Sequence, residues 1–196
     1  MKFTEYIKEN QIQNLNDNDG MLVVVDVQKE FSEYIPQGFI EKLTDYCKKF
    51  NSVYQIWDSN KADSPSYTFP NEKEEYIKKY GTKFSNQLVD IVDDLKKKFP
   101  DAKEGDRFKF KDADSFLVKV RNNHGWFYVN EELLELFKLL KGKKVIVVGG
   151  AENECIQDVY VAMKSFGIVP IYNHEYLYSA QTNDEQHVYN PKQDKK

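Results

Sequence analysis

The chain has 196 residues, which is enough for one domain with a sizeable hydrophobic core. Hydrophobic residues make up 40% of the chain and charged residues 31%, as is ordinary for a soluble globular protein. The formal net charge of −4 gives no basic footprint for nucleic acid, and no apolar run approaches the roughly 18 residues of a membrane span. We therefore expect neither nucleic acid nor a membrane as partner, and we expect a cytoplasmic protein.

The predicted elements alternate between helices and strands. The chain begins with a polar extension over 1–20, which carries a short helix over 3–14. The run over 21–27, which is apolar except for Asp26, is typical of a central parallel strand, because such a strand is buried on both faces. Further strands are predicted over 52–57, 107–111, 143–150 and 168–172, and helices over 39–50, 72–80, 86–99, 130–141 and 155–166. Asn130 is the expected N-cap of its helix, Gly167 ends the last helix, and residues 181–196 form a polar tail.

This alternation predicts a single α/β domain over 1–196, with a mostly parallel sheet and helices on both faces. Ligands in such sheets bind beyond the carboxyl ends of the strands. Four chemically capable residues are predicted at that edge. Asp26 ends the first strand, Asp58 follows the second, Lys111 ends the third, and Cys155 follows the fourth.

Cys155 follows the strand VIVVGG and opens an amphipathic helix. Because backbone N–H groups and the helix dipole favour negative charge there, a thiol at this place tends to ionise. Asp26 could accept its proton, Lys111 could stabilise the thiolate, and N–H groups around Ala151 and Cys155 could form an oxyanion hole. The alternative is that all three residues are structural. Cys155 would then be a small buried side chain between a helix and the sheet, Asp26 would stabilise a turn, and Lys111 would be exposed to solvent. Lys109 shares a strand face with Lys111, but the strand-end position and the shorter spacing to the following Phe favour Lys111.

Three segments, MLVVVDVQKEF, RFKFKDADSF and VIVVGGAENECIQDVYVAMKSFG, resemble the isochorismatase-like cysteine hydrolase family. The resemblance runs from about Met21 to Tyr172. It implies a flavodoxin-like three-layer α/β/α sandwich with five or six mostly parallel strands, and a homodimer or homotetramer. By motif position it implies a triad of Cys155, Asp26 and Lys111. It also implies a cis peptide bond between Gly150 and Ala151.

The middle segment, YQIWDSNKADSPSYTF, is similar to the Asp-x-His-x-x-x-His-x-x-Phe metal segment of the nicotinamidase branch. Asp58 matches the motif, whereas Asn60 stands where the first His is expected, and Asp63 or Ser64 stands near the second. Zn²⁺ prefers imidazole and thiolate ligands, so an oxygen set of Asp58, Asn60 and Asp63 would suit a harder ion, and only weakly. Two alternatives therefore remain. Either these residues bind a divalent metal, or the protein uses no cofactor.

The expected function is hydrolysis of a small carboxamide through a thioester on Cys155. Phe31 and Trp57 flank the predicted strand edge and are expected to wall a pocket for a planar substrate. Two alternatives remain. One is a non-catalytic binding or scaffold protein of the same fold, because the histidines are missing and Glu152 and Glu154 would raise the pKa of a nearby thiol. The other is isochorismatase-type hydrolysis of another small substrate, such as an enol ether.

Overall fold

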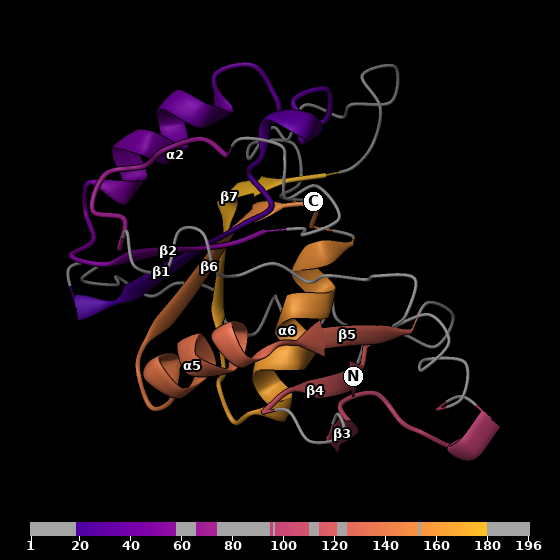
Figure 1. The fold of residues 1–196 in the computed structure, drawn as a ribbon. Helices are drawn as coiled ribbons and strands as arrows, with labels where there is room; N and C mark the ends of the chain where they lie inside the picture. The colour runs from indigo at the N-terminus through magenta and orange to yellow at the C-terminus, as the bar shows by residue number, and fades with distance from the viewer. Residues whose placement is uncertain are drawn as a thin grey trace, which may run out of the picture.

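The computed structural model describes residues 19–57, 66–73, 95, 97–109, 114–120, 125–152 and 154–179. The elements within them are, in chain order, β1 (Met21–Val25), the 3₁₀ helix η2 (Lys29–Phe31), α2 (Phe39–Cys47), β2 (Val53–Ile56), β3 (Arg107–Lys109), β4 (Phe116–Lys119), β5 (Trp126–Val129), α5 (Glu131–Leu140), β6 (Val145–Gly150), α6 (Cys155–Ser165) and β7 (Ile171–Tyr178). The fold is mixed α/β, as predicted (Figure 1).

Four strands form a parallel sheet in the order β2-β1-β6-β7. Strands β1, β2 and β6 are buried almost throughout, and β1 and β6 accordingly have continuous runs of residues without polar side chains, whereas β2 contains the buried Gln55. In β7 the register shifts, because Val147 pairs with Tyr172 whereas Gly149 pairs with Leu177. The extra residues of β7 reach α2, where the Asn173 amide donates to the hydroxyl of Tyr46.

Side chains alternate between the two faces of this sheet and pack against different helices. Val23 and Val147 lie in one hydrophobic cluster with side chains of α5 and α6. Val24 and Val148 lie in a second cluster with side chains of α2. Figure 1 shows α2 on one side of the sheet and α5 and α6 on the other. The sheet is therefore covered on both faces, as a parallel sheet requires.

Several predicted elements are confirmed to within three residues at each end, namely β1, β2, β6, α2, α5 and α6. Asn130 caps α5, since its side-chain oxygen accepts a hydrogen bond from the backbone N–H of Leu133 at 2.8 Å. Gly167 follows the end of α6 with a φ of 79°, a conformation that glycine adopts readily.

The prediction of a third parallel strand over 107–111 is wrong. Arg107–Lys109 forms β3, which pairs antiparallel with β4, and β4 pairs antiparallel with β5 in a separate three-stranded sheet. A strand of this hairpin does not follow the carboxyl-end rule of the parallel sheet, so the argument that placed Lys111 at that edge fails. One face of the small sheet packs on α6 through Val118 and Phe127, and the other carries Leu117 and Trp126.

Two further predictions need correction. The last strand is β7, over 171–178, rather than 168–172, because it begins only after Pro170, whose nitrogen cannot donate to a strand ladder. The helix predicted over 72–80 does not begin at Glu72, which instead forms an isolated bridge with Val53. Of the helix predicted over 86–99, residues 95, 97 and 98 are described and helical.

The described ranges contain three α-helices, which is too few to confirm the expected flavodoxin-like three-layer sandwich. That arrangement stays a prediction. The helix predicted over 3–14, most of the extension over 1–20 and the whole tail over 181–196 lie outside them. In the described part of the chain, no helix combines the length and apolar character needed to cross a bilayer.

Candidate active site

The carboxyl ends of β1 and β6 lie side by side, since Val25 is paired with Gly149. Asp26 directly follows β1, and Cys155 begins α6 after a short turn from β6. Asp26 is 5% exposed, whereas Cys155 is partly exposed and is not part of a disulfide bond. Burial raises the pKa of Tyr178, and the charges of Asp26 and Cys155 raise it further. The Tyr178 hydroxyl also donates to the Asp26 carbonyl at 2.7 Å, and the Tyr178 ring lies against Gly150 at the end of β6, so this phenol contacts the segments that lead to both predicted residues.

The turn between β6 and α6 is built around Ala151. The peptide bond between Gly150 and Ala151 is cis, which is the geometry that the family resemblance implies. The Ala151 carbonyl accepts hydrogen bonds from the N–H groups of Glu154, at 3.0 Å, and Ile156, at 3.2 Å. These bonds wrap the chain into the first turn of α6 and place Cys155 at its N-terminus.

The two acidic residues near Cys155, Glu152 and Glu154, have different environments. Glu152 lies 3.0 Å from the Nδ1 atom of His174 on β7, and its backbone N–H donates to the Tyr178 carbonyl at 2.8 Å. Glu154 is exposed and stands at the N-cap of α6 without a side-chain capping bond. The Glu152 carboxylate thus lies within hydrogen-bond distance of an imidazole on β7.

Trp57 lies directly after β2 and is held by its neighbour Gln55. The indole N–H of Trp57 donates to the side-chain oxygen of Gln55 at 3.1 Å, and the Ser66 hydroxyl donates to the same oxygen at 2.6 Å. The Gln55 amide donates to the Tyr67 carbonyl at 3.0 Å and to the Glu72 carboxylate. Gln55 is 1% exposed, so its hydrogen bonds fix the orientation of the indole.

Phe31 ends the short helix η2, which follows β1. Its side chain is partly exposed, as is that of Trp57. The chain after η2 turns back through hydrogen bonds from the N–H groups of Tyr34 and Ile35 to the Phe31 carbonyl. Both predicted wall residues therefore follow strands of the parallel sheet at its carboxyl edge, which is where the prediction put them. Their contact with substrate stays a prediction.

The predicted lysine, Lys111, lies outside the described residues. Its alternative, Lys109, is in β3, and its ammonium lies 3.8 Å from the carboxylate of Asp114. The Lys109 side chain is 61% exposed, which is typical of a solvated ion pair on a hairpin. The structure thus argues against Lys109 as a buried catalytic cation.

The predicted metal ligands Asp58, Asn60 and Asp63 also lie outside the described residues, together with Ser64. Among the side chains that the structure does describe, no group of three or more His, Cys, Asp or Glu residues is arranged to hold a metal ion. The metal at this segment stays a prediction.

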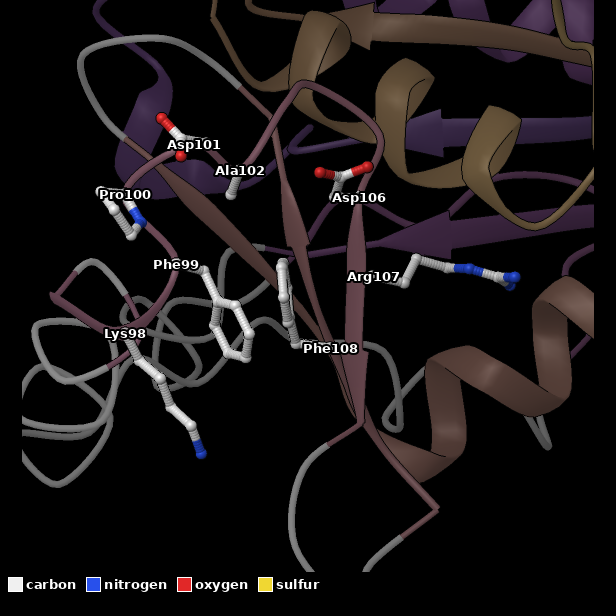
Figure 2. A pocket seen from close by; sticks show the side chains of 8 residues that line it. All are labelled: Lys98, Phe99, Pro100, Asp101, Ala102, Asp106, Arg107 and Phe108. Carbon is white, nitrogen blue, oxygen red and sulfur yellow. The ribbon is translucent and has the colours of Figure 1, made fainter.

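A separate hollow of about 470 Å³ lies over residues 98–108. Figure 2 shows the rings of Phe99 and Phe108 close together in it, with their centroids 4.6 Å apart. The Arg107 side chain points away from these rings in the same view, and its guanidinium lies over the ring of Phe166 at 4.6 Å. The hollow is lined by none of the predicted site residues, and no thiol or hydroxyl side chain is among the residues that line it.

The sequence interpretation missed Tyr178, whose hydroxyl donates to the backbone carbonyl of Asp26 at 2.7 Å. The residue belongs to β7, which was placed too early in the chain. The signal that points to it is the pair Gly149–Gly150, since two glycines in a buried strand indicate a close approach by another group.

No known protein family, curated protein or solved structure matches this chain.

Proposed function

We propose that the protein is a cysteine-dependent hydrolase of a small carboxamide, nearest the nicotinamidase branch of the isochorismatase-like family. The observation that carries the proposal is the convergence of Asp26 and Cys155 at one sheet edge, beside Tyr178, whose hydroxyl donates to the Asp26 carbonyl and whose ring lies against Gly150 in the segment that leads to Cys155. The two residues follow adjacent parallel strands, at the place where such sheets bind ligands. The roles of Cys155, Asp26 and Lys111 rest on the motif resemblance.

In the first half of the reaction, the Cys155 sulfur attacks the amide carbonyl as its proton passes to Asp26. The negative charge that develops on the carbonyl oxygen is stabilised by backbone N–H groups of the turn around Ala151 and Cys155, at the N-terminus of α6. The tetrahedral adduct then collapses. The C–N bond breaks, Asp26 returns the proton to nitrogen, and ammonia leaves a thioester on Cys155.

In the second half, Asp26 removes a proton from water, which attacks the thioester carbonyl. The C–S bond breaks, the proton returns to sulfur, and the carboxylic acid product leaves. Lys111 supplies a positive charge near the acid and the thiolate. Trp57, held by Gln55, and Phe31 offer aromatic surface to a flat substrate.

Ammonia release from a panel of aromatic and aliphatic carboxamides, including nicotinamide, tests this proposal. Cys155→Ala is expected to reduce release to background, and Asp26→Asn to reduce it by about 10²- to 10⁴-fold, the usual contribution of a general acid–base group. Cys47→Ala is the matched control, because Cys47 is buried in α2 and plays no part in the mechanism. Lys111→Met is expected to lose activity and Lys109→Met to keep it.

Release of no ammonia by the wild-type protein across the whole panel would rule out the amidase. Turnover of an enol ether by that same protein would instead favour the isochorismatase-type alternative. Binding of these compounds without any turnover would favour the scaffold alternative.

The same proposal includes the finer features that the resemblance implies. These are the flavodoxin-like three-layer sandwich, assembly as a homodimer or homotetramer, and a cytoplasmic location. Cys47 and Cys155 are not joined in a disulfide bond.

A further inference from the structure

Tyr178 ends β7 and is buried, with 4% of its surface exposed. Its hydroxyl donates a hydrogen bond of 2.7 Å to the backbone carbonyl of Asp26, a residue 152 positions away in the chain. The proposed mechanism uses Asp26 but assigns no task to Tyr178. A buried phenol bonded to the peptide of the proposed acid is therefore a candidate for a supporting role.

The backbone of Asp26 is held from two sides. Its N–H donates to the carbonyl of Ile56 on β2 at 2.9 Å, and its own carbonyl accepts from Tyr178 on β7. Between these bonds Asp26 has a φ of 50°, in the left-handed region that few residues other than glycine occupy. A residue keeps such a conformation when its surroundings enforce it, and such residues cluster at functional sites.

The Tyr178 ring also contacts the turn that leads to Cys155. It is paired with Gly150 across the sheet and lies so close that a Cβ on Gly150 would overlap the ring. The ring meets Phe39 of α2 edge-on, with centroids 5.5 Å apart, and the Tyr178 carbonyl accepts from the N–H of Glu152. One residue thus links the end of β1 to the β6–α6 turn.

The hydroxyl of Tyr178 remains a donor. Burial raises its pKa, and the negative charges that form on Asp26 and Cys155 raise it further, so it stays protonated at neutral pH. The hydrogen bond to Asp26 therefore persists whichever of the two site residues carries the negative charge.

We propose that Tyr178 is a positioning residue, whose hydroxyl fixes the Asp26 peptide so that the carboxylate is presented to Cys155. This inference rests on the proposed function, because it assigns Asp26 the task of exchanging a proton with that thiol. It makes β7 a necessary part of the site, although β7 supplies no group to the reaction.

The test compares Tyr178→Phe with wild type and with Asp26→Asn. The first readout is the rate of alkylation of Cys155 by iodoacetamide as a function of pH, with the labelled peptide identified by mass spectrometry. Cys47 does not interfere, because burial and the charge of Glu72 raise its pKa to about 12. A carboxylate beside a thiol raises the thiol pKa, so Asp26→Asn is expected to lower the apparent pKa of Cys155. Tyr178→Phe should shift it in the same direction.

The second readout is steady-state amide hydrolysis. Tyr178→Phe keeps the ring that packs on Gly150 and Phe39, so the variant is expected to fold and to bind substrate with KM within about twofold of wild type. Its kcat is expected to fall by about 10- to 100-fold, since displacement of a catalytic group by about 1 Å has effects of this size. Tyr172→Phe, which removes a buried hydroxyl from the same strand, is the matched control and should leave kcat unchanged.

The outcomes separate the two proposals. If Asp26→Asn shifts the alkylation profile and Tyr178→Phe does not, the positioning role is overturned while the amidase proposal stands. If both variants shift the profile but wild type hydrolyses no amide, the positioning role is supported and the proposed function fails. If neither variant shifts it, Asp26 does not act on Cys155, and both proposals fall.

Discussion

Gly149 stands opposite Val25 in the central strand pair, beside the proposed acid. It has a φ of 104°, and a Cβ built on it would overlap backbone atoms of Val25. Backbone atoms in the middle of a sheet cannot move aside cheaply. Two separate demands, a left-handed conformation and a close approach of strands, therefore require glycine at this position.

Alanine substitution separates these two demands. Gly142, with a φ of 74°, has open space around the position of a Cβ, so Gly142→Ala should cost only the left-handed penalty of about 1–2 kcal/mol. Gly149→Ala should cost about 1–3 kcal/mol more, the usual effect of overpacking. Urea unfolding at pH 7 measures both free energies. Equal losses in the two variants would show that the contact with Val25 is unimportant.

At the level of single residues, the local sequence predicts that Asp26 follows a strand and that Cys155 begins a helix. It does not predict the long-range contacts that fix their positions. Asp26 does follow the first strand, and Cys155 does open a helix, because an apolar run and a Gly-Gly turn mark these boundaries. The bond from Tyr178 to Asp26 joins residues at opposite ends of the chain, and no local pattern encodes it. The triad roles themselves stay predictions.

At the scale of elements, the long amphipathic and the fully buried segments were predictable, whereas short strands were not. The three residues of β3 alternate in exposure, and this pattern is the same in a parallel strand and in an antiparallel hairpin. Strand β5 contains the run WFYV, in which both faces are apolar because the small sheet packs on both sides. Its hydrophobic pattern therefore lacks the period of two that marks a half-exposed strand.

Helix α5 begins with a capping bond that local sequence did predict. Replacement of Asn130 by Ala removes the acceptor for the N–H of Leu133 and should lower the free energy of unfolding by about 1 kcal/mol. Asn130→Asp keeps an acceptor and places a negative charge at the positive end of the helix, so it should stay within about 0.5 kcal/mol of wild type. Thermal and urea unfolding measure both variants. An equal loss in both would mean that Asn130 acts through another contact.

For the whole molecule, the parallel sheet separates two hydrophobic clusters, one with α5 and α6 and the other with α2. Glu72 lies close to the α2 cluster, where it accepts hydrogen bonds from Gln55 and from the backbone N–H of Phe69. Burial raises the pKa of Glu72, and these two hydrogen bonds partly offset that effect. The folded protein therefore holds the proton on Glu72 more tightly than the unfolded chain does.

This difference predicts a pH dependence of global stability. The contribution of Glu72 is fully present below its unfolded pKa and is lost as pH rises through the higher folded pKa. Glu72→Gln keeps an oxygen acceptor without a charge, so the variant should be more stable than wild type at pH 8. The advantage should shrink as pH falls toward 4. Urea unfolding across this range measures it, and a variant less stable than wild type at pH 8 would contradict the assignment.

The contact between Gly150 and Tyr178 ties the identities of two distant positions together, because they share one small volume. Alanine could replace Gly150 only if a smaller residue also replaced Tyr178. That exchange would also remove the oxygen that anchors Asp26. Substitution of Gly150, which does not contact substrate in the proposed mechanism, would thus impair the proposed reaction. Glycine is required at this position because of the role proposed for Tyr178.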